Sequence, residues 1–325
     1  MKKILVTGSH GFIGSNLILK FFENKSNFIV GIDYNINSSK LRKLRHKKIK
    51  NHKNSKNFKF INHNLKNKIK ERIKFDIIIH LAAQPGVQLS KTNKQIYIDN
   101  NITGLINILD YCSNQKIKNF FYASSSSVYG NLKFQSEDSK IEPTSFYGLT
   151  KKFGEEIIHH YSKNCTTKFI ALRFFTVYGP LGRTDMSYFK FLNQHINKKK
   201  ISLYNYGKNK RSFTYIDDIT YTINLMIDKI HMFKDKFNVY NIGNPECRSV
   251  NEIVKYYNLF LKRKINSNKI KSITQDPLKT HAIMKKLKKK TGNRKFVKLD
   301  DGLNKFLNWY KETYLPKNFF LYFKK

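Results

Sequence analysis

The sequence contains few cysteines, and they are widely separated. Of the 325 residues only three are cysteine: Cys112, Cys165 and Cys247. Their odd number and wide spacing exclude a disulfide framework and provide no ligand pattern for a metal cluster. We therefore expect a reduced, cytoplasmic protein that holds no metal.

Long apolar stretches are also absent. No run approaches the roughly 20 residues that a helix needs to cross a bilayer. The N-terminal segment MKKILVTGSHGFIG has neither the full apolar core nor the small-residue cleavage site of a signal peptide. We expect no membrane association.

Acidic residues are scarce. Lysine and arginine together number 62 against 22 aspartate and glutamate residues, for a formal net charge of +40. Such a charge could serve nucleic-acid binding, but the lysines are spread along the chain, and arginine, which grips phosphates and bases bidentately, is uncommon. We expect no nucleic-acid partner. The positive field favours instead a doubly anionic nucleotide substrate.

What the first half does contain is an alternation of strand-like and helix-like segments. Apolar runs bounded by turns indicate buried strands, and apolar residues on one helical face indicate helices. Strands are expected at 3–8, 28–33, 58–61, 76–80, 120–124 and 168–175, and helices at 12–22, 93–114 and 145–162. This order predicts an α/β fold with a Rossmann-type, doubly wound parallel sheet.

The second half is less regular. Helices are expected at 186–198, 217–230, 249–263 and 299–313, with strands at 201–204 and 237–243. We predict a smaller C-terminal substrate lobe that is interleaved with the Rossmann domain. The predicted cofactor domain spans 1–172 plus about 213–243, and the lobe spans about 173–212 plus 244–325. The lysine-rich segment 35–56 is expected at the surface, with no assigned structure.

A glycine-rich turn follows the first strand. The stretch GSHGFIG places Gly8, Gly11 and Gly14 at the head of a helix, where a dinucleotide pyrophosphate can approach backbone amides. Asp33 ends the second strand about twenty residues later, where a carboxylate binds a ribose 2′-hydroxyl. The same carboxylate would repel a 2′-phosphate, so the pattern favours NAD over NADP.

The stretches SSSSVYG and YGLTK carry the candidate chemistry. Tyr147 and Lys151 are four residues apart, so they project from one face of a helix. A nearby ammonium group favours a phenolate, so we expect Lys151 to lower the pKa of Tyr147 and make it a general base. The serine run, residues 124–127, ends a strand, which is where doubly wound sheets bind ligands.

Together these stretches resemble the extended short-chain dehydrogenase/reductases of the NAD-dependent nucleotide-sugar epimerase branch, and most closely UDP-glucuronate 4-epimerases. The resemblance rests on LVTGSHGFIGSNL, HLAAQPGV, YASSSSVYG, SFYGLTKK, LRFFTVYGPLGRTDM, YGKNKRSFTYIDD and YNIGN, from residue 4 to about 244. It implies Tyr147, Lys151 and Ser125 as catalytic residues. It also implies NAD contacts from Gly8, Gly11, Phe12, Ile13, Gly14, Asp33, Leu81, Ala82, Ala83, Tyr147 and Lys151.

The resemblance also implies a substrate and a reaction. In the family, hydride leaves C4 of a UDP-sugar for NAD, the 4-keto sugar turns over, and the hydride returns to its other face. Ser126 and Ser127 stand where related dehydratases and decarboxylases carry carboxylates, which argues for plain epimerisation. The family's substrate contacts fall on Ser126, Ser127, Thr176, Arg183, Arg211 and Asp276.

Thr176 and Arg183 suggest glucuronate as the sugar, because a guanidinium fork matches a carboxylate. The alternative is a UDP-glucose or UDP-N-acetylhexosamine 4-epimerase, and a more distant one is an RNA-binding or regulatory Rossmann protein.

Two residues depart from the family pattern. They are Asn64 and Leu181, where the family usually has Asp and Trp. Family members commonly dimerise, so we expect a homodimer, and the product suggests a role in polysaccharide biosynthesis.

Overall fold

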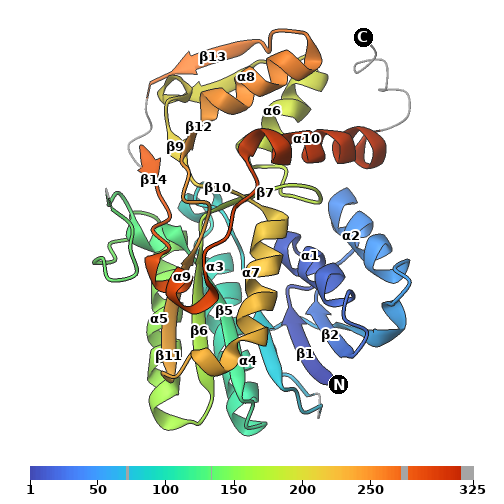
Figure 1. Cartoon of the computed structure of the whole chain (residues 1–325), viewed down its shortest axis with the longest axis vertical. Coiled ribbons are helices and arrows are strands. Elements are labelled where there is room, and N and C mark those ends of the chain that lie inside the picture. The colour runs from blue at the N-terminus through green and yellow to red at the C-terminus, as the bar shows by residue number, and fades with distance from the viewer. Residues whose placement is uncertain (71–72, 133, 272–276, 316–325) are drawn as a thin grey trace.

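The molecule is built around one parallel sheet of seven strands. The computed structural model describes residues 1–70, 73–132, 134–271 and 277–315. In spatial order the strands are β11 (Phe237–Ile242), β6 (Lys168–Phe174), β5 (Asn119–Ser125), β4 (Ile77–His80), β1 (Lys2–Thr7), β2 (Asn27–Asp33) and β3 (Phe58–Asn62), and each pairs in parallel with its neighbours. The winding direction reverses between β1 and β4, which confirms the predicted Rossmann-type doubly wound sheet (Figure 1).

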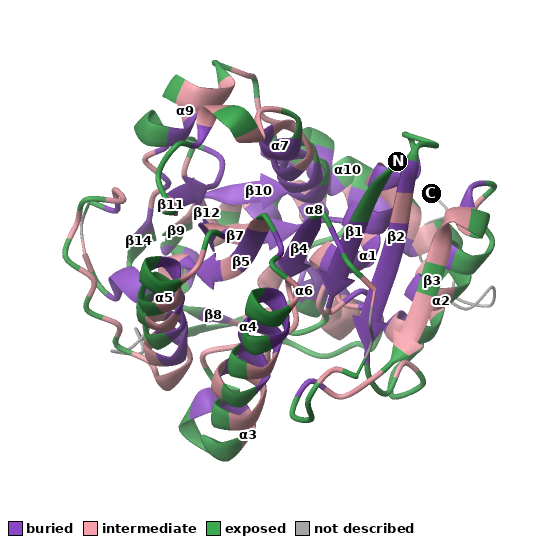
Figure 2. Cartoon of the chain, turned by 90° about the horizontal axis from the view of Figure 1, so that it is seen from below, coloured by how far each residue is buried: buried purple, intermediate pink, exposed green. Residues whose placement is uncertain are grey.

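Helices cover both faces of this sheet, and strand residues alternate between two cores. Ile4 and Val6 face a core formed with α1 (Phe12–Phe21) and α7 (Ile216–Asp228). Leu5 faces the other core, formed with α4 (Gly104–Asn114) and α5 (Phe146–Asn164). Figure 2 shows β2 and the inner part of β1 mostly buried, while α4 and α5 are exposed on their outer sides. The strands are therefore apolar on both faces, as a sheet covered on two sides requires.

In the first half of the chain, two segments differ from the sequence expectation. Residues 35–56 include a helix, α2 (Lys40–Lys50), which packs beside α1, and a short 3-10 turn at Ser55–Asn57. The helix expected over 93–114 is not continuous, because a short turn α3 (Gln95–Tyr97) and a π-helical segment (Ile98–Thr103) precede α4. π-Helical turns of this kind frequently occur at functional sites.

The remaining elements form short strand pairs and peripheral helices. The strand pairs are β7 (Thr176–Tyr178) with β10 (Phe213–Tyr215), β8 (Ile201–Tyr204) with β13 (Ser267–Ile270), and β9 (Lys210–Arg211) with both β12 (Arg248–Ser249) and β14 (Lys279–Thr280). The helices are α6 (Ser187–Ile196), α8 (Val250–Leu261), α9 (Lys285–Thr291) and α10 (Leu299–Trp309). Figure 1 shows α6, α8, α10 and β13 grouped at one end, beyond the strand ends of the main sheet. The domain boundaries given above stay a prediction.

Candidate active site

The glycine-rich turn lies between β1 and α1 and is tightly packed. Gly8 has a φ of +67°, and a Cβ there would lie 2.7 Å from the backbone nitrogen of Ala82. A Cβ on Gly14 would collide with the carbonyl oxygen of Gly8. Within the described chain, α1 has no side-chain N-cap and no acidic residue in its first turn. Its free amides and positive dipole end therefore fit a dinucleotide pyrophosphate.

Two further strand ends complete this edge. Leu81 and Ala82 follow β4 and bond to the end of β1, with Leu81 N 3.2 Å from Thr7 O and Ala82 N 3.3 Å from Thr7 Oγ1. Asp33 ends β2, and its carboxylate accepts hydrogen bonds from the amides of His10 and Tyr34 at 2.7 Å each. The structure thus brings the predicted cofactor residues, including Phe12, Ile13 and Ala83, to one edge of the sheet.

Asp33 also has a cationic neighbour that we did not expect. Arg42 Nη1 on α2 lies 2.8 Å from Asp33 Oδ1. The guanidinium partly neutralises the carboxylate, whose role in binding a ribose hydroxyl stays a prediction. Arg42 could have been noticed only if 40–50 had been assigned as a helix. The buried residues of α2 are Leu41, Arg45 and Ile49. Their four-residue spacing is the sequence signal that could have identified this helix.

The serine run divides into structural and site-facing hydroxyls. Ser124 donates to Glu155, which forms a buried ion pair with Arg173, so this first serine supports the sheet. Ser125 Oγ lies 3.1 Å from both the amide and the hydroxyl of Ser127. The Ser125 hydroxyl lies close enough to Tyr147 to lower the pKa of the phenol. The run is thus a capped strand end that continues into a 3-10 turn, Ser126–Tyr129.

Tyr147 and Lys151 lie on the first turns of α5, whose N-cap Ser145 accepts a bond from the Gly148 amide at 3.0 Å. Lys151 Nζ donates to Ala123 O at 2.8 Å, and burial lowers the pKa of Lys151 to about 7 although Glu155 opposes this. The expectation that Lys151 lowers the pKa of Tyr147 is wrong here. Burial raises the pKa of Tyr147, and the neighbouring Ser125 hydroxyl and the charge of Arg183 only partly offset this.

Arg183 reaches the same site from the loop after β7. Its guanidinium lies close enough to Tyr147 to influence the pKa of the phenol. A Cβ on Gly86 would lie 3.2 Å from Arg183 Nη2 and 3.7 Å from the hydroxyl of Tyr97, a buried residue whose ring centroid is 6.1 Å from that of Tyr147. Arg183 is also held bidentately by Asp185, at 3.0 and 2.6 Å. Sequence reasoning missed Asp185, although it lies in the quoted GRTDM stretch.

The other predicted substrate residues are less closely gathered. Ser126 begins the 3-10 turn, and Thr176 begins β7, where it is half-buried and paired in register with Phe213. Arg211 lies on β9, where its Nη1 donates to Lys210 O at 2.8 Å. Asp276 lies outside the described residues.

The π-helical segment adds a residue that the sequence did not reveal. Asn101 accepts a bond from the Gln84 amide at 2.7 Å and donates to Gln84 O at 3.1 Å. It also donates to the Thr150 hydroxyl at 3.0 Å, on the turn between Tyr147 and Lys151. This buried amide therefore ties the loop after β4 to the catalytic turn of α5.

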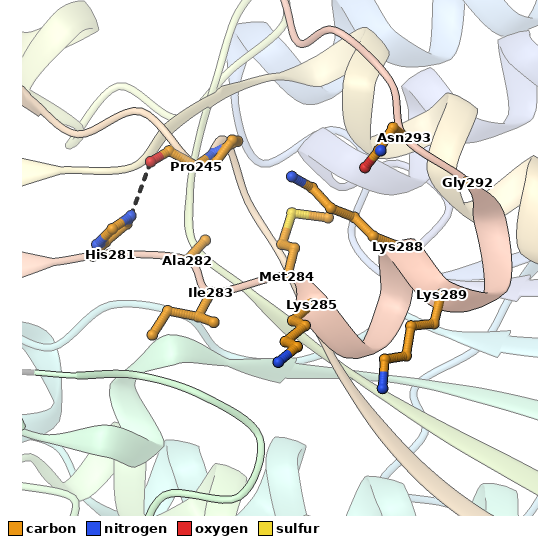
Figure 3. Close-up of a pocket in the computed structure, with 10 residues that line it drawn as sticks. All are labelled: Pro245, His281, Ala282, Ile283, Met284, Lys285, Lys288, Lys289, Gly292 and Asn293. Carbon is orange, nitrogen blue, oxygen red and sulfur yellow. Dashed lines mark hydrogen bonds between the residues drawn. The ribbon is translucent and has the colours of Figure 1, made fainter.

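A cavity of about 620 Å³ lies apart from the predicted site residues. Figure 3 shows its lining: Pro245, His281, Ala282, Ile283, Met284, Lys285, Lys288, Lys289, Gly292 and Asn293. A ring nitrogen of His281, Nε2, lies 2.9 Å from Pro245 O and closes one side. The lining contains none of the predicted cofactor or catalytic residues, so this hollow does not mark the candidate active site.

A dinucleotide loop and a Tyr–Lys pair at one edge of a doubly wound sheet define the class of Rossmann enzymes that transfer hydride. Within it, residues 4–243 match the model of the NAD dependent epimerase/dehydratase family, and the chain belongs to that family. NAD is accordingly its cofactor, and the protein is an isomerase of the epimerase type.

Similar proteins cover nearly the whole chain. Protein CapI of Staphylococcus aureus is 35% identical over 334 residues, covering 96% of this chain and 99% of CapI. UDP-glucuronate 4-epimerase 4 of Arabidopsis thaliana is 33% identical over 332 residues, covering 96% of this chain and 76% of the plant protein. The structure of UDP-glucuronic acid 4-epimerase from Bacillus cereus with UDP-glucuronic acid and NAD has a TM-score of 0.86 and 32% identity, covering 95% of this chain and 99% of that one.

Proposed function

We propose that this protein epimerises UDP-glucuronate to UDP-galacturonate at C4 of the sugar. The UDP-sugar class is supported by the relatives named above, of which the Bacillus cereus enzyme is a complex with UDP-glucuronic acid and NAD. The observation that carries the choice of sugar is the position of Arg183. Its guanidinium lies within electrostatic reach of Tyr147, so a carboxylate on the reacting sugar would have a bidentate partner beside the general base.

The side chains of the site suggest a division of labour. NAD, when bound, supplies the acceptor that takes hydride from C4 and gives it back. Tyr147 accepts the proton of the 4-hydroxyl at its phenol oxygen and returns it, and Ser125 hydrogen-bonds the reacting oxygen. Lys151 lies one helical turn from Tyr147 on the same face of α5, and its side chain would contact the bound NAD. The glycine-rich turn and Asp33 would hold the dinucleotide.

The carboxylate of glucuronate creates a hazard. Its 4-keto form is a β-keto acid, which loses CO₂ when the breaking C–C bond aligns with the carbonyl π system. Arg183 and Thr176 are proposed to hold the carboxylate out of that alignment. Ser126 and Ser127 provide no acid or base for an elimination. These features support epimerisation without loss of carbon.

One observation favours a neutral sugar instead. Arg183 already has a bidentate partner in Asp185, whose side chain is 62% exposed. A paired guanidinium has less need of a substrate carboxylate, so a UDP-glucose or UDP-N-acetylhexosamine 4-epimerase is the second candidate. The glucuronate proposal requires that the sugar carboxylate shares Arg183 with Asp185 or displaces it.

Turnover of UDP-glucuronate and UDP-glucose, with products resolved by NMR, separates the two candidates. We expect UDP-galacturonate from the wild type, and a kcat loss of about 10²–10⁴-fold in Tyr147→Phe because the general base is removed. Turnover of the neutral sugar alone would overturn the glucuronate proposal.

Arg183→Ala tests the role of the guanidinium. We expect a reduced kcat/KM for UDP-glucuronate only, together with release of CO₂ and a UDP-pentose. Asp185→Asn is the matched variant, and it should lower the KM for UDP-glucuronate because the competing carboxylate is lost. An Arg183→Ala enzyme that is inactive, or that still epimerises cleanly, would count against the proposed control of decarboxylation.

A further inference from the structure

Helix α2 presents three basic side chains to the edge of the cofactor site. Arg42, Arg45 and His46 are spaced by three and four residues, so they share one face of the helix. Arg42 pairs with Asp33, and His46 Nδ1 lies 3.0 Å from His10 Nε2 in the glycine-rich turn. The third residue, Arg45, connects this turn to a different part of the molecule.

The Arg45 guanidinium is buried against backbone carbonyl groups. Its residue is 6% exposed. The Nε atom lies 3.0 Å from Leu181 O, Nη2 lies 2.7 Å from Leu181 O and 3.3 Å from Gly182 O, and Nη1 lies 3.2 Å from His10 O. Burial, reinforced by the charge of Arg42, lowers the pKa of Arg45 to about 10, so the group is still charged at neutral pH. All three guanidinium nitrogens donate to carbonyl oxygens, which offsets the cost of burying the cation.

The carbonyls that Arg45 holds immediately precede Arg183. Leu181 adopts a left-handed backbone conformation, with a φ of +60°, which a side chain of this size rarely takes. Three bonds from one guanidinium to this strained turn determine where the following residue points. That residue is Arg183, whose side chain reaches Gly86 and Tyr147.

We propose that Arg45 is a positioning residue. It orients the Arg183 side chain by holding the preceding backbone, and it connects that backbone to the cofactor loop. The proposal rests on the function proposed above, because it assigns Arg183 to the sugar carboxylate. The planar fork of arginine is essential, since a lysine ammonium cannot bond Leu181, Gly182 and His10 in one plane. Arg45 does not itself contact the reacting atoms in this account.

The first test compares Arg45→Lys and Arg45→Met with Lys47→Met, a change on the exposed side of the same helix. We expect Arg45→Met to raise the KM for UDP-glucuronate at least tenfold with a smaller change in kcat, and Arg45→Lys to fall between it and the wild type. Activity on UDP-glucose and NAD content should fall less than activity on UDP-glucuronate. The melting temperature should fall, because the carbonyls of Leu181, Gly182 and His10 lose their buried donor. An equal loss on both sugars would reduce Arg45 to a structural role and overturn the proposal.

A double-variant comparison adds a readout that is specific to Arg183. If Arg45 acts through Arg183, adding Arg45→Met to Arg183→Ala should cost almost nothing further in kcat/KM for UDP-glucuronate. Additive losses from the two changes would overturn the proposal. Lys47→Met should be additive, with little effect of its own.

A last measurement distinguishes failure of this inference from failure of the proposed function. If the wild type does not turn over UDP-glucuronate, the choice of substrate is wrong, but the positioning of the loop can still be measured. Amide hydrogen exchange of residues 181–183 should be faster in Arg45→Met than in Lys47→Met, because the loop loses its three bonds. Unchanged exchange would overturn the role of Arg45 without any reference to substrate.

Discussion

Asp33 was predicted to select NAD, and at the scale of single residues its partner Arg42 changes how that selectivity can be tested. Because Arg42 Nη1 is only 2.8 Å from the carboxylate, the site already contains a group that could meet a 2′-phosphate. We expect Asp33→Ser to shift the ratio of NADP to NAD affinity by at least tenfold towards NADP, measured by calorimetric titration of the two cofactors. The double variant Asp33→Ser/Arg42→Met should lose this gain, and an unchanged NAD preference in Asp33→Ser would contradict the idea.

The serine run, residues 124–127, shows which features of the site the sequence could predict and which it could not. Its position at a strand end could be predicted from the residues, and the role of Ser125 was implied only by the family resemblance. The structural role of Ser124 could not, because its partner Glu155 is distant in sequence and reaches it only through packing. The direction of the Tyr147 pKa was wrong for the same kind of reason: desolvation depends on everything that surrounds a group.

At the scale of elements, the catalytic helix α5 is joined to β6 by a buried ion pair. Arg173 and Glu155 form two bonds at 2.9 and 2.7 Å, and each side chain is 5% exposed. Removing one partner leaves a buried charge unpaired, so Glu155→Gln should lower the free energy of unfolding by about 3–5 kcal/mol in urea denaturation.

A matched control lies one residue further along α5. Lys152 and Glu156 form a pair at 3.8 Å with a half-exposed carboxylate, so Glu156→Gln should cost less than about 1 kcal/mol. Equal costs for Glu155→Gln and Glu156→Gln would show that burial does not determine the strength of the inner pair.

Elements with strong local patterns were predicted well, and elements shaped by contacts were not. The strands of the sheet and helices such as α5 have apolar periodicities that hold whatever surrounds them. Helix α2 has a mostly cationic sequence and depends on packing against α1 and on Arg45 for its place. The π-helical turn places Asn101 against Gln84 and Thr150, partners that lie far from it in the sequence.

At the scale of the whole molecule, buried histidines predict acid sensitivity. Burial, reinforced by Lys151, lowers the pKa of His80 from 6.5 to about 3, and burial lowers the pKa of His10 to about 4. Between these values and 6.5 the unfolded chain binds more protons than the folded one, so stability falls as pH falls. Each histidine lowers the free energy of unfolding by up to about 1.4 kcal/mol for every pH unit between 6.5 and its folded-state pKa.

His80→Asn should therefore flatten the dependence of unfolding free energy on pH between about 6 and 4. The exposed His231 provides the comparison, because His231→Asn should leave the slope as it is in the wild type. Parallel pH curves for wild type and His80→Asn would contradict the assignment.

The whole chain carries a formal charge of +40. None of the helices in the described ranges is long and apolar enough to cross a bilayer. The predicted cytoplasmic location, homodimer and absence of a nucleic-acid partner stay predictions, since they depend on surroundings that a single chain does not contain.

The sequence by itself determined the order of the strands of the main sheet, the cofactor turn and the spacing of Tyr147 and Lys151. These depend on local backbone preferences and on short spacings that any reader of the chain can measure. The tertiary structure alone decided that Arg45 holds Leu181, 136 positions away, that Asp185 occupies the fork of Arg183, and that burial raises the pKa of Tyr147. Those outcomes depend on desolvation and on which groups come into contact across the fold. Neither can be predicted from the spacing of residues in the sequence.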